Sequence, residues 1–251
     1  MQPTLTSTKN EIVQRARRLH SAKQRRLTGL VLVEGPTLIE EAAAARMEFV
    51  TIFAVEDDAD QLRLAEAAGG SVIVTSKRVL DHIATTATPR GPIAIVRRPE
   101  PARVSTVSDT LILSDIADPG NAGTMVRTAT ALGFHVATVT GSVDLWSPKA
   151  LRAGSGAQFS APPRVVESLS DIARVGFRTI GLVVSGGSDP EVLTGASPVA
   201  LVVGSEAHGL PEDLIKECDD LVTIPTIGSV ESLNAAAAAS IAMWERARLR
   251  K

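Results

Sequence analysis

The sequence has little of the residue types that carry disulfide or metal chemistry. Its 251 residues include one cysteine, Cys218, no tyrosine and four histidines. A single cysteine excludes an intrachain disulfide, which is typical of a reducing compartment, so we expect a cytoplasmic protein. The histidines are scattered and form no i, i+4 ligand pair, so we expect no metal site. They are His20, His82, His135 and His208.

Long apolar runs are also missing. No segment approaches the roughly 20 apolar residues that a membrane helix needs, and the N-terminus has no apolar stretch of the kind found in secretory signals. We therefore expect no membrane partner. Hydrophobic residues make up 44% of the chain and charged residues 22%, which is an ordinary balance for a soluble globular protein.

Charge is distributed unevenly, although the formal net charge is only −2. From Met1 to Leu30 there are seven basic residues against one acid, Glu11. Such a local excess can neutralise nucleic-acid phosphates, but a solvated basic helix face gives the same pattern. Charge alone leaves both interpretations open. The basic residues are Lys9, Arg15, Arg17, Arg18, Lys23, Arg25 and Arg26.

Residues 1–98 show alternating apolar patterns that predict a small α/β domain. Helices are expected over 9–19, 37–46, 59–68 and 77–83, and strands over 30–34, 49–55, 71–74 and 92–97. Gly35-Pro36 and Gly69-Gly70 punctuate these elements. Residues 99–109 are polar, lack periodicity and contain two prolines, so we interpret them as an interdomain linker.

Residues 110–251 form a second α/β series. Strands are expected over 111–114, 135–140, 179–184, 199–203 and 221–224, and helices over 122–132, 147–152, 169–175, 212–218 and 232–248. The segment 199–203 is continuously apolar, as buried parallel strands tend to be. The alternation of strands and helices predicts a doubly wound, mostly parallel sheet.

Three loops of this second domain follow predicted strands, and ligands of open α/β sheets bind at the carboxyl ends of strands. The first loop, Asp118-Pro119-Gly120-Asn121-Ala122-Gly123, leads into a helix that carries Arg127, and Asn121 is its expected N-cap. Because helical side chains lean toward the N-terminus, Arg127 is expected to point back to the strand end. Alone, this segment indicates only a capped helix with a surface arginine.

Taken singly, the second and third loops also indicate no specific function. Gly204-Ser205-Glu206-Ala207-His208-Gly209-Leu210 predicts a tight turn whose backbone groups suit an adenosine-like ligand, or an ordinary strand-to-helix turn. Ile224-Pro225-Thr226-Ile227-Gly228-Ser229 leads to polar Ser232 and Asn234 around Leu233, with Ser229 as a candidate helix cap.

The order and spacing of the three loops together resemble one family. Asn-x-Gly-x-x-x-Arg from Asn121, Gly-x-Glu-x-x-Gly-Leu from Gly204 and Ile-Pro-x-x-x-Ser-x-Glu-Ser-Leu-Asn from Ile224 resemble the three motifs of SpoU/TrmH-type RNA 2′-O-methyltransferases. Residues 144–157 resemble the segment that this family carries between its first and second motifs. Leu32-Val33-Glu34-Gly35 and residues 88–94 resemble its substrate-binding module, which is similar to ribosomal protein L30.

This resemblance implies a fold and partners that periodicity does not show. The family's catalytic domain, of the SPOUT type, has a deep C-terminal trefoil knot, and its members are homodimers that pair through the first and last helices of that domain. The resemblance further implies S-adenosylmethionine as the methyl donor and ribosomal RNA, most of all 23S RNA, as the substrate.

The resemblance also assigns roles to residues. The implied catalytic residues are Asn121, Arg127, Glu206, Ser232 and Asn234. The implied cofactor-binding residues, acting largely through backbone groups, are Thr140, Gly141, Val203, Gly204, Ile224 and Leu233. The expected RNA contacts in the first domain are Arg15, Arg18, Lys23, Arg25, Arg26 and Arg90.

A mechanism follows as a hypothesis. An arginine, with an ordinary pKa of roughly 12.5–13.8, is a poor base, so we expect Arg127 to stabilise negative charge that forms on the ribose oxygen. Glu206 is expected to orient Arg127, while Asn121 and Ser232 orient the ribose or a phosphate.

Three other functions compete with this one. A nicotinamide-dependent dehydrogenase predicts Gly-x-Gly-x-x-Gly after the first strand, and the nearest candidate, at Gly154, has no third glycine and follows a helix. A transfer-RNA methyltransferase would share the chemistry. A non-catalytic RNA-binding or ribosome-assembly protein would not need Arg127, Glu206 and Asn234 together.

Overall fold

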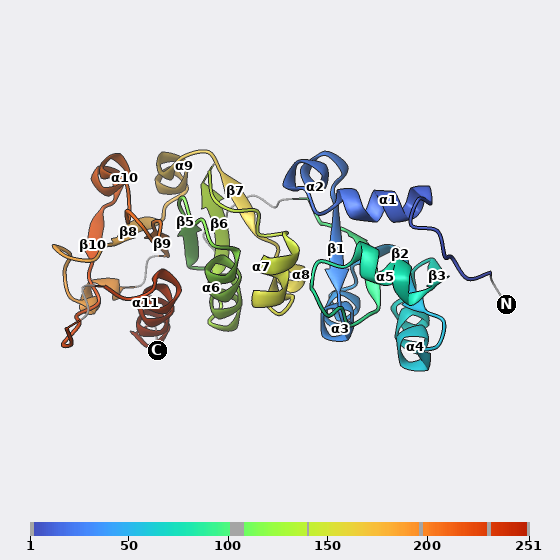
Figure 1. The fold of residues 1–251 in the computed structure, drawn as a ribbon. Helices are drawn as coiled ribbons and strands as arrows, with labels where there is room; N and C mark the ends of the chain where they lie inside the picture. Colours follow the sequence, from blue (N-terminus) through green and yellow to red (C-terminus); the bar gives the residue numbers. More distant parts are fainter. Residues whose placement is uncertain (1–2, 101–107, 140, 196–197, 230–231, 250–251) are drawn as a thin grey trace. The chain divides into compact units, whose positions relative to one another are not determined.

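The structure, a computed structural model, divides the chain into two compact units (Figure 1). It describes residues 3–100, 108–139, 141–195, 198–229 and 232–249. The first unit comprises the residues up to Glu100 together with Trp146–Ser160, and the second comprises the rest. Most of the expected linker, residues 101–107, lies outside the described residues.

The first unit contains a four-stranded mixed sheet in the order β1-β4-β2-β3. Strand β4 runs antiparallel to β1 and β2, and β2 runs parallel to β3. The elements of this unit are α1 (Glu11–Arg18), α2 (Ala22–Thr28), β1 (Leu30–Glu34), α3 (Pro36–Ala44), β2 (Glu48–Val55), α4 (Ala59–Ala68), β3 (Val72–Thr75), α5 (Lys77–Ile83), β4 (Ile93–Arg97), α7 (Pro148–Ala153) and α8 (Ala157–Ser160).

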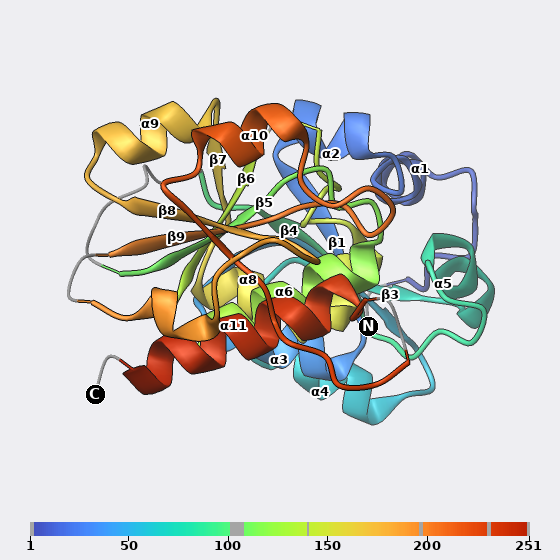
Figure 2. The same cartoon turned by 90° about the vertical axis from the view of Figure 1, so that its left-hand side faces the viewer.

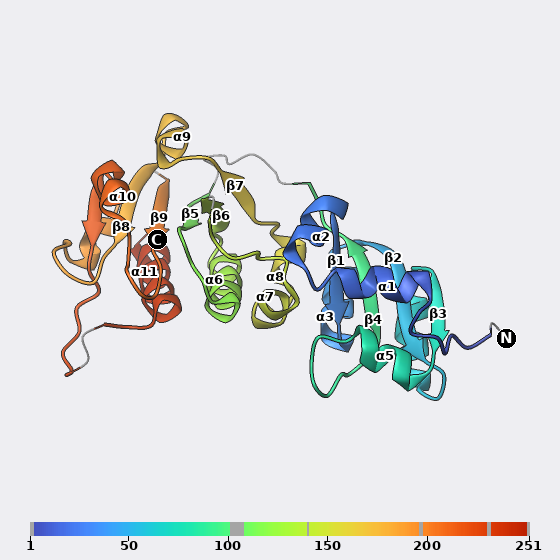
Figure 3. The ribbon, with the colours of Figure 1, turned by 45° about the horizontal axis from the view of Figure 1, so that its top comes forward.

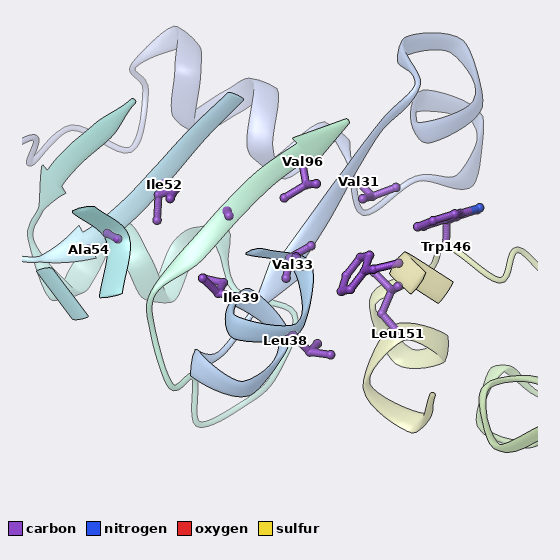
Figure 4. Packing of buried hydrophobic residues seen from close by; sticks show 13 residues of the cluster. Val31, Val33, Leu38, Ile39, Ile52, Ala54, Val96, Trp146 and Leu151 are labelled. Carbon is purple, nitrogen blue, oxygen red and sulfur yellow. The ribbon is translucent and has the colours of Figure 1, made fainter. Parts of the chain in front are cut away.

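Both faces of this sheet are buried, because the side chains of β1 alternate between two cores. Leu30 and Leu32 pack with residues of α1 and α5 on one face. Val31 and Val33 pack on the other face with residues of α3 and with Trp146, Leu151 and Phe159 (Figure 4). The segment 146–160 therefore helps to build the core of the first unit, although the expected domain boundaries, 1–98 and 110–251, place it in the second.

The second unit contains a six-stranded sheet in the order β10-β8-β9-β5-β6-β7, with every neighbouring pair parallel. The elements of this unit are β5 (Thr110–Leu113), α6 (Pro119–Ala131), β6 (His135–Val139), β7 (Arg164–Val166), α9 (Leu169–Arg174), β8 (Arg178–Leu182), the 3-10 helix η1 (Pro190–Leu193), β9 (Val199–Val203), α10 (Glu212–Glu217), β10 (Asp220–Val222) and α11 (Ala235–Leu249).

Helices cover both faces of this parallel sheet. Figure 2 shows α9 and α10 on one face and α6 and α11 on the other, and Figure 3 shows α6 and α11 beside each other from a second direction. Helices α6 and α11 meet where the Ser240 hydroxyl lies 3.3 Å from that of Thr128. The predicted doubly wound parallel α/β sheet is therefore confirmed, and the trefoil knot stays a prediction.

A buried ion pair joins the last helix to the start of the first strand of this unit. Arg246 of α11 donates to Asp109 through Nε at 2.8 Å and through Nη2 at 3.3 Å, and both side chains are inaccessible to solvent. Its Nη1 also donates to the carbonyls of Leu193 and Gly195 at 2.7 and 2.8 Å. Asp109 accepts a further bond from the Val199 amide at 2.7 Å. One guanidinium thus joins α11 to two other segments of chain, at Asp109 and at residues 193–195.

Four short elements were not expected from the sequence: α2, α8, η1 and β7. Each is only three to seven residues long, too short for a clear period. None of the described helices has the length and apolar character that crossing a bilayer requires.

Candidate active site

The three motif loops all leave the same edge of the parallel sheet. They follow the carboxyl ends of β5, β9 and β10, and β5 lies directly beside β9. Because every strand of this sheet points the same way, loops that are distant in sequence converge at one edge. Any polar site built from the three loops must form there.

Helix α6 begins earlier than expected, and its cap is Asp118 and not Asn121. The Asp118 Oδ1 accepts a hydrogen bond from the Asn121 amide at 2.9 Å, and Pro119 occupies the first turn. The fixed φ of proline suits the first helical position, so Asp-Pro is the start signal that the sequence analysis missed. The Asn121 side chain is therefore available for other bonds.

One residue from each loop joins a single hydrogen-bonded cluster. The Asn234 Nδ2 donates to Asn121 Oδ1 at 3.1 Å, and the Asn121 Nδ2 donates to Glu206 Oε1 at 2.9 Å. A carboxylate only accepts hydrogen bonds, so Glu206 fixes which way the Asn121 amide faces. We call Asn234, Asn121 and Glu206 the motif cluster.

The carboxylate of the motif cluster is held in its charged form. Partial burial alone would raise the pKa of Glu206, but hydrogen bonds from the Asn121 side chain and from backbone amides, including that of Ala117 at 3.4 Å, together lower it below its ordinary value. Glu206 is therefore ionised near neutral pH, and it acts as an acceptor for Asn121.

The start of α11 is also organised by the motif cluster. The Asn234 Oδ1 accepts from the amides of Ala236 and Ala237 at 2.9 and 3.2 Å, so Asn234 caps the helix. The candidate cap Ser229 lies well before the helix, which begins at Ala235 and not at Ser232. Ser232 is exposed and, among the described residues, makes no recorded hydrogen bond.

Arg127 stands apart from the motif cluster. It lies on α6 with an exposed side chain, and no hydrogen bond or ion pair of Arg127 is recorded within the described ranges. The expectation that Glu206 orients Arg127 is not met, because the structure pairs Glu206 with Asn121. The Arg127 guanidinium is thus an exposed charged donor on α6.

The loop after β9 needs glycine where the family resemblance places a cofactor-binding residue. A Cβ on Gly204 would lie 2.2 Å from the carbonyl group of Gly209, so only glycine fits. Ser205 and Gly209 close the turn with two backbone bonds of 3.0 and 2.9 Å. This tight turn projects Glu206, and the preceding Val203 carbonyl accepts from the Ser114 amide at 2.9 Å.

The loop after β6 lies against the loop after β5. Gly141 has a φ of +112°, and a Cβ there would lie 2.6 Å from the Asp115 carboxylate. Asp115 itself has a φ of +52°, which is uncommon for a residue with a side chain. The Ser142 hydroxyl bonds the Leu113 carbonyl at 2.8 Å. Thr140 lies outside the described residues.

The remaining cofactor candidates, Ile224 and Leu233, are both half-buried. Among the described residues, no acceptor is recorded for the backbone N–H groups of Gly204, Ile224 or Leu233.

Most of the expected RNA contacts in the first unit are exposed. Arg15 and Arg18 line a depression of about 550 Å³ beside α1 and α2, and Arg90 lines another of about 580 Å³. Lys23 and Arg26 are exposed on α2. Arg25 differs: it is only 3% exposed, and its Nη1 donates to the carbonyls of Leu19 and His20 at 2.7 and 2.9 Å. Arg25 therefore joins α1 to α2, a role that charge patterning cannot reveal.

No group of three or more potential metal ligands gathers in the part of the chain that the structure describes.

Residues 109–244 match the SpoU rRNA methylase family, and residues 10–94 match the MRM3-like substrate binding domain. The chain belongs to the SpoU rRNA methylase family. The family resemblance of the three loops is thereby confirmed, and with it the enzyme class, an S-adenosylmethionine-dependent RNA methyltransferase.

Two curated relatives match this SpoU methylase along most of both chains. It is 29% identical to the 23S rRNA (guanosine(2553)-2′-O)-methyltransferase RlmP of Bacillus subtilis, over 96% of this chain and 97% of the relative. It is 31% identical to an uncharacterized tRNA/rRNA methyltransferase of Synechocystis, over 98% of this chain and 93% of the relative.

Solved structures agree with this assignment. An AdoMet-bound rRNA methyltransferase from Sinorhizobium meliloti superposes with a TM-score of 0.86 at 28% identity, covering 98% of this chain and 97% of that one. The SpoU methyltransferase AviRb from Streptomyces viridochromogenes, in complex with AdoMet, gives a TM-score of 0.86 at 25% identity, over 96% and 98% of the two chains.

Proposed function

We propose that this SpoU methylase transfers a methyl group from S-adenosylmethionine to a ribose 2′-hydroxyl of 23S ribosomal RNA. The observation that carries the proposal is the motif cluster, in which one residue from each of the three loops meets at one edge of the parallel sheet. The name of the B. subtilis relative, a 23S rRNA 2′-O-methyltransferase, supports this choice of substrate. A ribosomal substrate would place the protein in the cytoplasm.

The residues at this edge fit the cofactor. The backbone N–H groups of Gly204, Ile224 and Leu233, which have no acceptor among the described residues, suit its polar groups, and the half-buried side chains of Ile224 and Leu233 suit an adenine ring. When bound, the cofactor supplies a methyl group on a sulfonium, and the carbon–sulfur electron pair returns to sulfur as the carbon bonds to the ribose oxygen.

We propose that Arg127 stabilises the negative charge that develops on the ribose oxygen. Its exposed guanidinium is a fixed positive charge that stabilises the oxygen as the hydroxyl proton leaves to water. Lysine would supply a point charge without the planar fork, so Arg127→Lys should also lose most of its activity.

The motif cluster would position the ribose. Each amide nitrogen carries two hydrogens, and Asn121 and Asn234 each use one of them inside the cluster. The second hydrogen of each amide is available to a ribose hydroxyl or a phosphate oxygen. Ionised Glu206 keeps the Asn121 amide in this orientation, and Ser232 adds a hydroxyl two residues before Asn234.

We also propose that the active form is a homodimer that pairs through α6 and α11. On α11, Ile241 is 43% exposed and Trp244 is 60% exposed, on the face opposite to the buried Ala239 and Met243. Large exposed apolar side chains at i, i+3 indicate a surface that is covered in the assembly. Light scattering should give twice the chain mass, and Trp244→Asp should give the monomer mass.

The deciding experiment is methyl transfer from radiolabelled S-adenosylmethionine to 23S rRNA that lacks the modification, followed by nuclease mapping of 2′-O-methyl nucleosides. We expect label in one such nucleotide and its loss in Arg127→Ala. Transfer to transfer RNA alone would keep the chemistry and overturn the substrate. RNA binding without any transfer would indicate a non-catalytic binding protein.

A further inference from the structure

A buried carboxylate stands at the end of the first strand of the first unit. Glu34 of β1 is 7% exposed, and its Oε2 accepts from the amide and the hydroxyl of Thr85 at 2.8 and 2.7 Å. Its Oε1 accepts from the Thr86 hydroxyl. A buried carboxylate is stable only when several donors surround it, so Glu34 fixes the start of the loop that follows α5.

The next residue of the chain fixes the far end of the same loop. The Gly35 amide donates to the Pro92 carbonyl at 3.0 Å, and the φ of Gly35 is +99°, a conformation that favours glycine. Glu34 and Gly35 therefore hold both ends of residues 85–92. We call residues 85–92 the threonine loop.

A third anchor comes from far along the sequence. The Arg152 Nη1 of α7 donates to the Thr85 hydroxyl at 2.7 Å and lies 4.0 Å from Glu34 Oε2. The Thr85 hydroxyl thus accepts from Arg152 while it donates to Glu34, which uses its single hydrogen. Arg152 is held in place because neighbouring Leu151, with Trp146 and Phe159, packs into the core of this unit (Figure 4).

The threonine loop presents a cation at a hollowed surface. Arg90 is exposed, and within the described ranges it has no recorded hydrogen bond or ion pair. It lines a depression of about 580 Å³ that also holds Lys77 and the three carboxylates Glu40, Asp58 and Asp60. An exposed arginine beside carboxylates, in a substrate-binding domain, suits the edge of an unpaired RNA base, which offers both acceptors and donors.

We propose that Glu34, Thr85 and Arg152 are positioning residues for substrate RNA, which act by fixing the threonine loop and with it Arg90. This inference rests on the proposed function, and it assigns Arg152, from the segment between the first two motifs, to RNA recognition and not to the cofactor site. The bonded chain Arg152–Thr85–Glu34 is the observation that carries it.

Thr85→Val tests the proposal, because it keeps the shape of the side chain and removes both bonds of the hydroxyl. Thr85→Ser keeps the hydroxyl and is the matched control. We expect Thr85→Val to weaken binding of a 23S rRNA transcript about tenfold, the effect of roughly 1.4 kcal/mol. The KM for RNA should rise equally, while kcat at saturating RNA and the Kd for S-adenosylmethionine stay at wild-type values. Hydrogen exchange of amides 85–92 should accelerate, and Thr85→Ser should behave as wild type.

Arg152→Gln is a second variant that should fold, since the Arg152 side chain is 35% exposed. It should raise the KM for RNA in the same direction, whereas Arg174→Gln, which removes an exposed guanidinium paired with Asp171 in the other unit, should not. Unchanged RNA affinity in both Thr85→Val and Arg152→Gln would overturn the proposal. A joint loss of cofactor affinity and thermal stability would also overturn it, since it indicates a purely structural role. Failure of the wild type to methylate rRNA would overturn the proposed function, whereas wild-type methylation with unchanged RNA affinity in both variants would overturn this inference alone.

Discussion

Arg246→Met should destabilise the second unit far more than a surface substitution does. Arg246 is 1% exposed, and it donates to both oxygens of Asp109 and to the carbonyls of Leu193 and Gly195. Methionine has a similar length but no donor. The variant therefore leaves a buried carboxylate and two carbonyl groups without this guanidinium.

The expected loss of stability follows from the interactions that this substitution removes. Removing one partner of a buried ion pair costs about 3–5 kcal/mol, because the remaining charge stays away from water. For a chain of this size about 1 kcal/mol lowers Tm by roughly 2–4 °C, so a decrease of roughly 6–20 °C is expected. Asp109→Asn in the same chain removes the buried charge, so the double variant should regain part of the loss.

Differential scanning calorimetry and urea unfolding would measure these differences. The control is Arg248→Met, two residues further along α11, where an exposed guanidinium pairs with Glu245. Arg248→Met should leave Tm almost unchanged, since exposed pairs contribute little. A Tm for Arg246→Met within the error of the Arg248→Met value would refute the reasoning.

Three further outcomes are expected. Gly204→Ala should abolish S-adenosylmethionine binding in equilibrium dialysis, because its Cβ would lie 2.2 Å from Gly209, whereas Gly228→Ala, whose Cβ would meet no described residue beyond its chain neighbours within 4 Å, should bind normally. The pKa of Glu206 is lowered from 4.5, so its bonds form above that pH and are lost only as pH falls through a lower value. The pH profile of methyl transfer should therefore have no limb from Glu206 between pH roughly 5 and 8, and such a limb, absent in Glu206→Gln, would contradict this. Leu151→Ala should cost about 2–5 kcal/mol in urea unfolding of the first unit, as for other buried leucines.

The sheets could be predicted because their signals are local. Val199–Val203 is expected as a buried parallel strand, and the structure places it in the interior of the second sheet as β9. Strand β7 was missed because it has three residues, and Val165 at its centre is 61% exposed on the outermost strand. A period cannot be detected in so short a segment.

The location of segment 146–160 could not be predicted. Its pattern shows a helix with an apolar face, and the observed α7 agrees with this. Periodicity shows which face of a helix is buried, but not which core receives it. Trp146 and Leu151 pack against β1 and α3, more than 100 positions earlier in the sequence.

The sequence predicted which residues form the candidate site better than it predicted the hydrogen bonds between them. Asn121, Glu206 and Asn234 come together because three parallel strands end at one edge. The sequence did not indicate that Asp118 replaces Asn121 as the cap, or that Glu206 pairs with Asn121 in place of Arg127. Those choices depend on distances between loops, which spacing within a loop does not encode.

The packing of residues 146–160 has a consequence for dissecting the protein. A cut after Glu100 looks natural from the family matches, since the substrate-binding match ends at 94 and the methylase match begins at 109. It would separate Trp146, Leu151 and Phe159 from the residues that bury them and would remove one wall of the core of the other fragment. Each fragment would then expose an apolar surface and should precipitate or bind chaperones. The two fragments should therefore be expressed and exchanged as one chain.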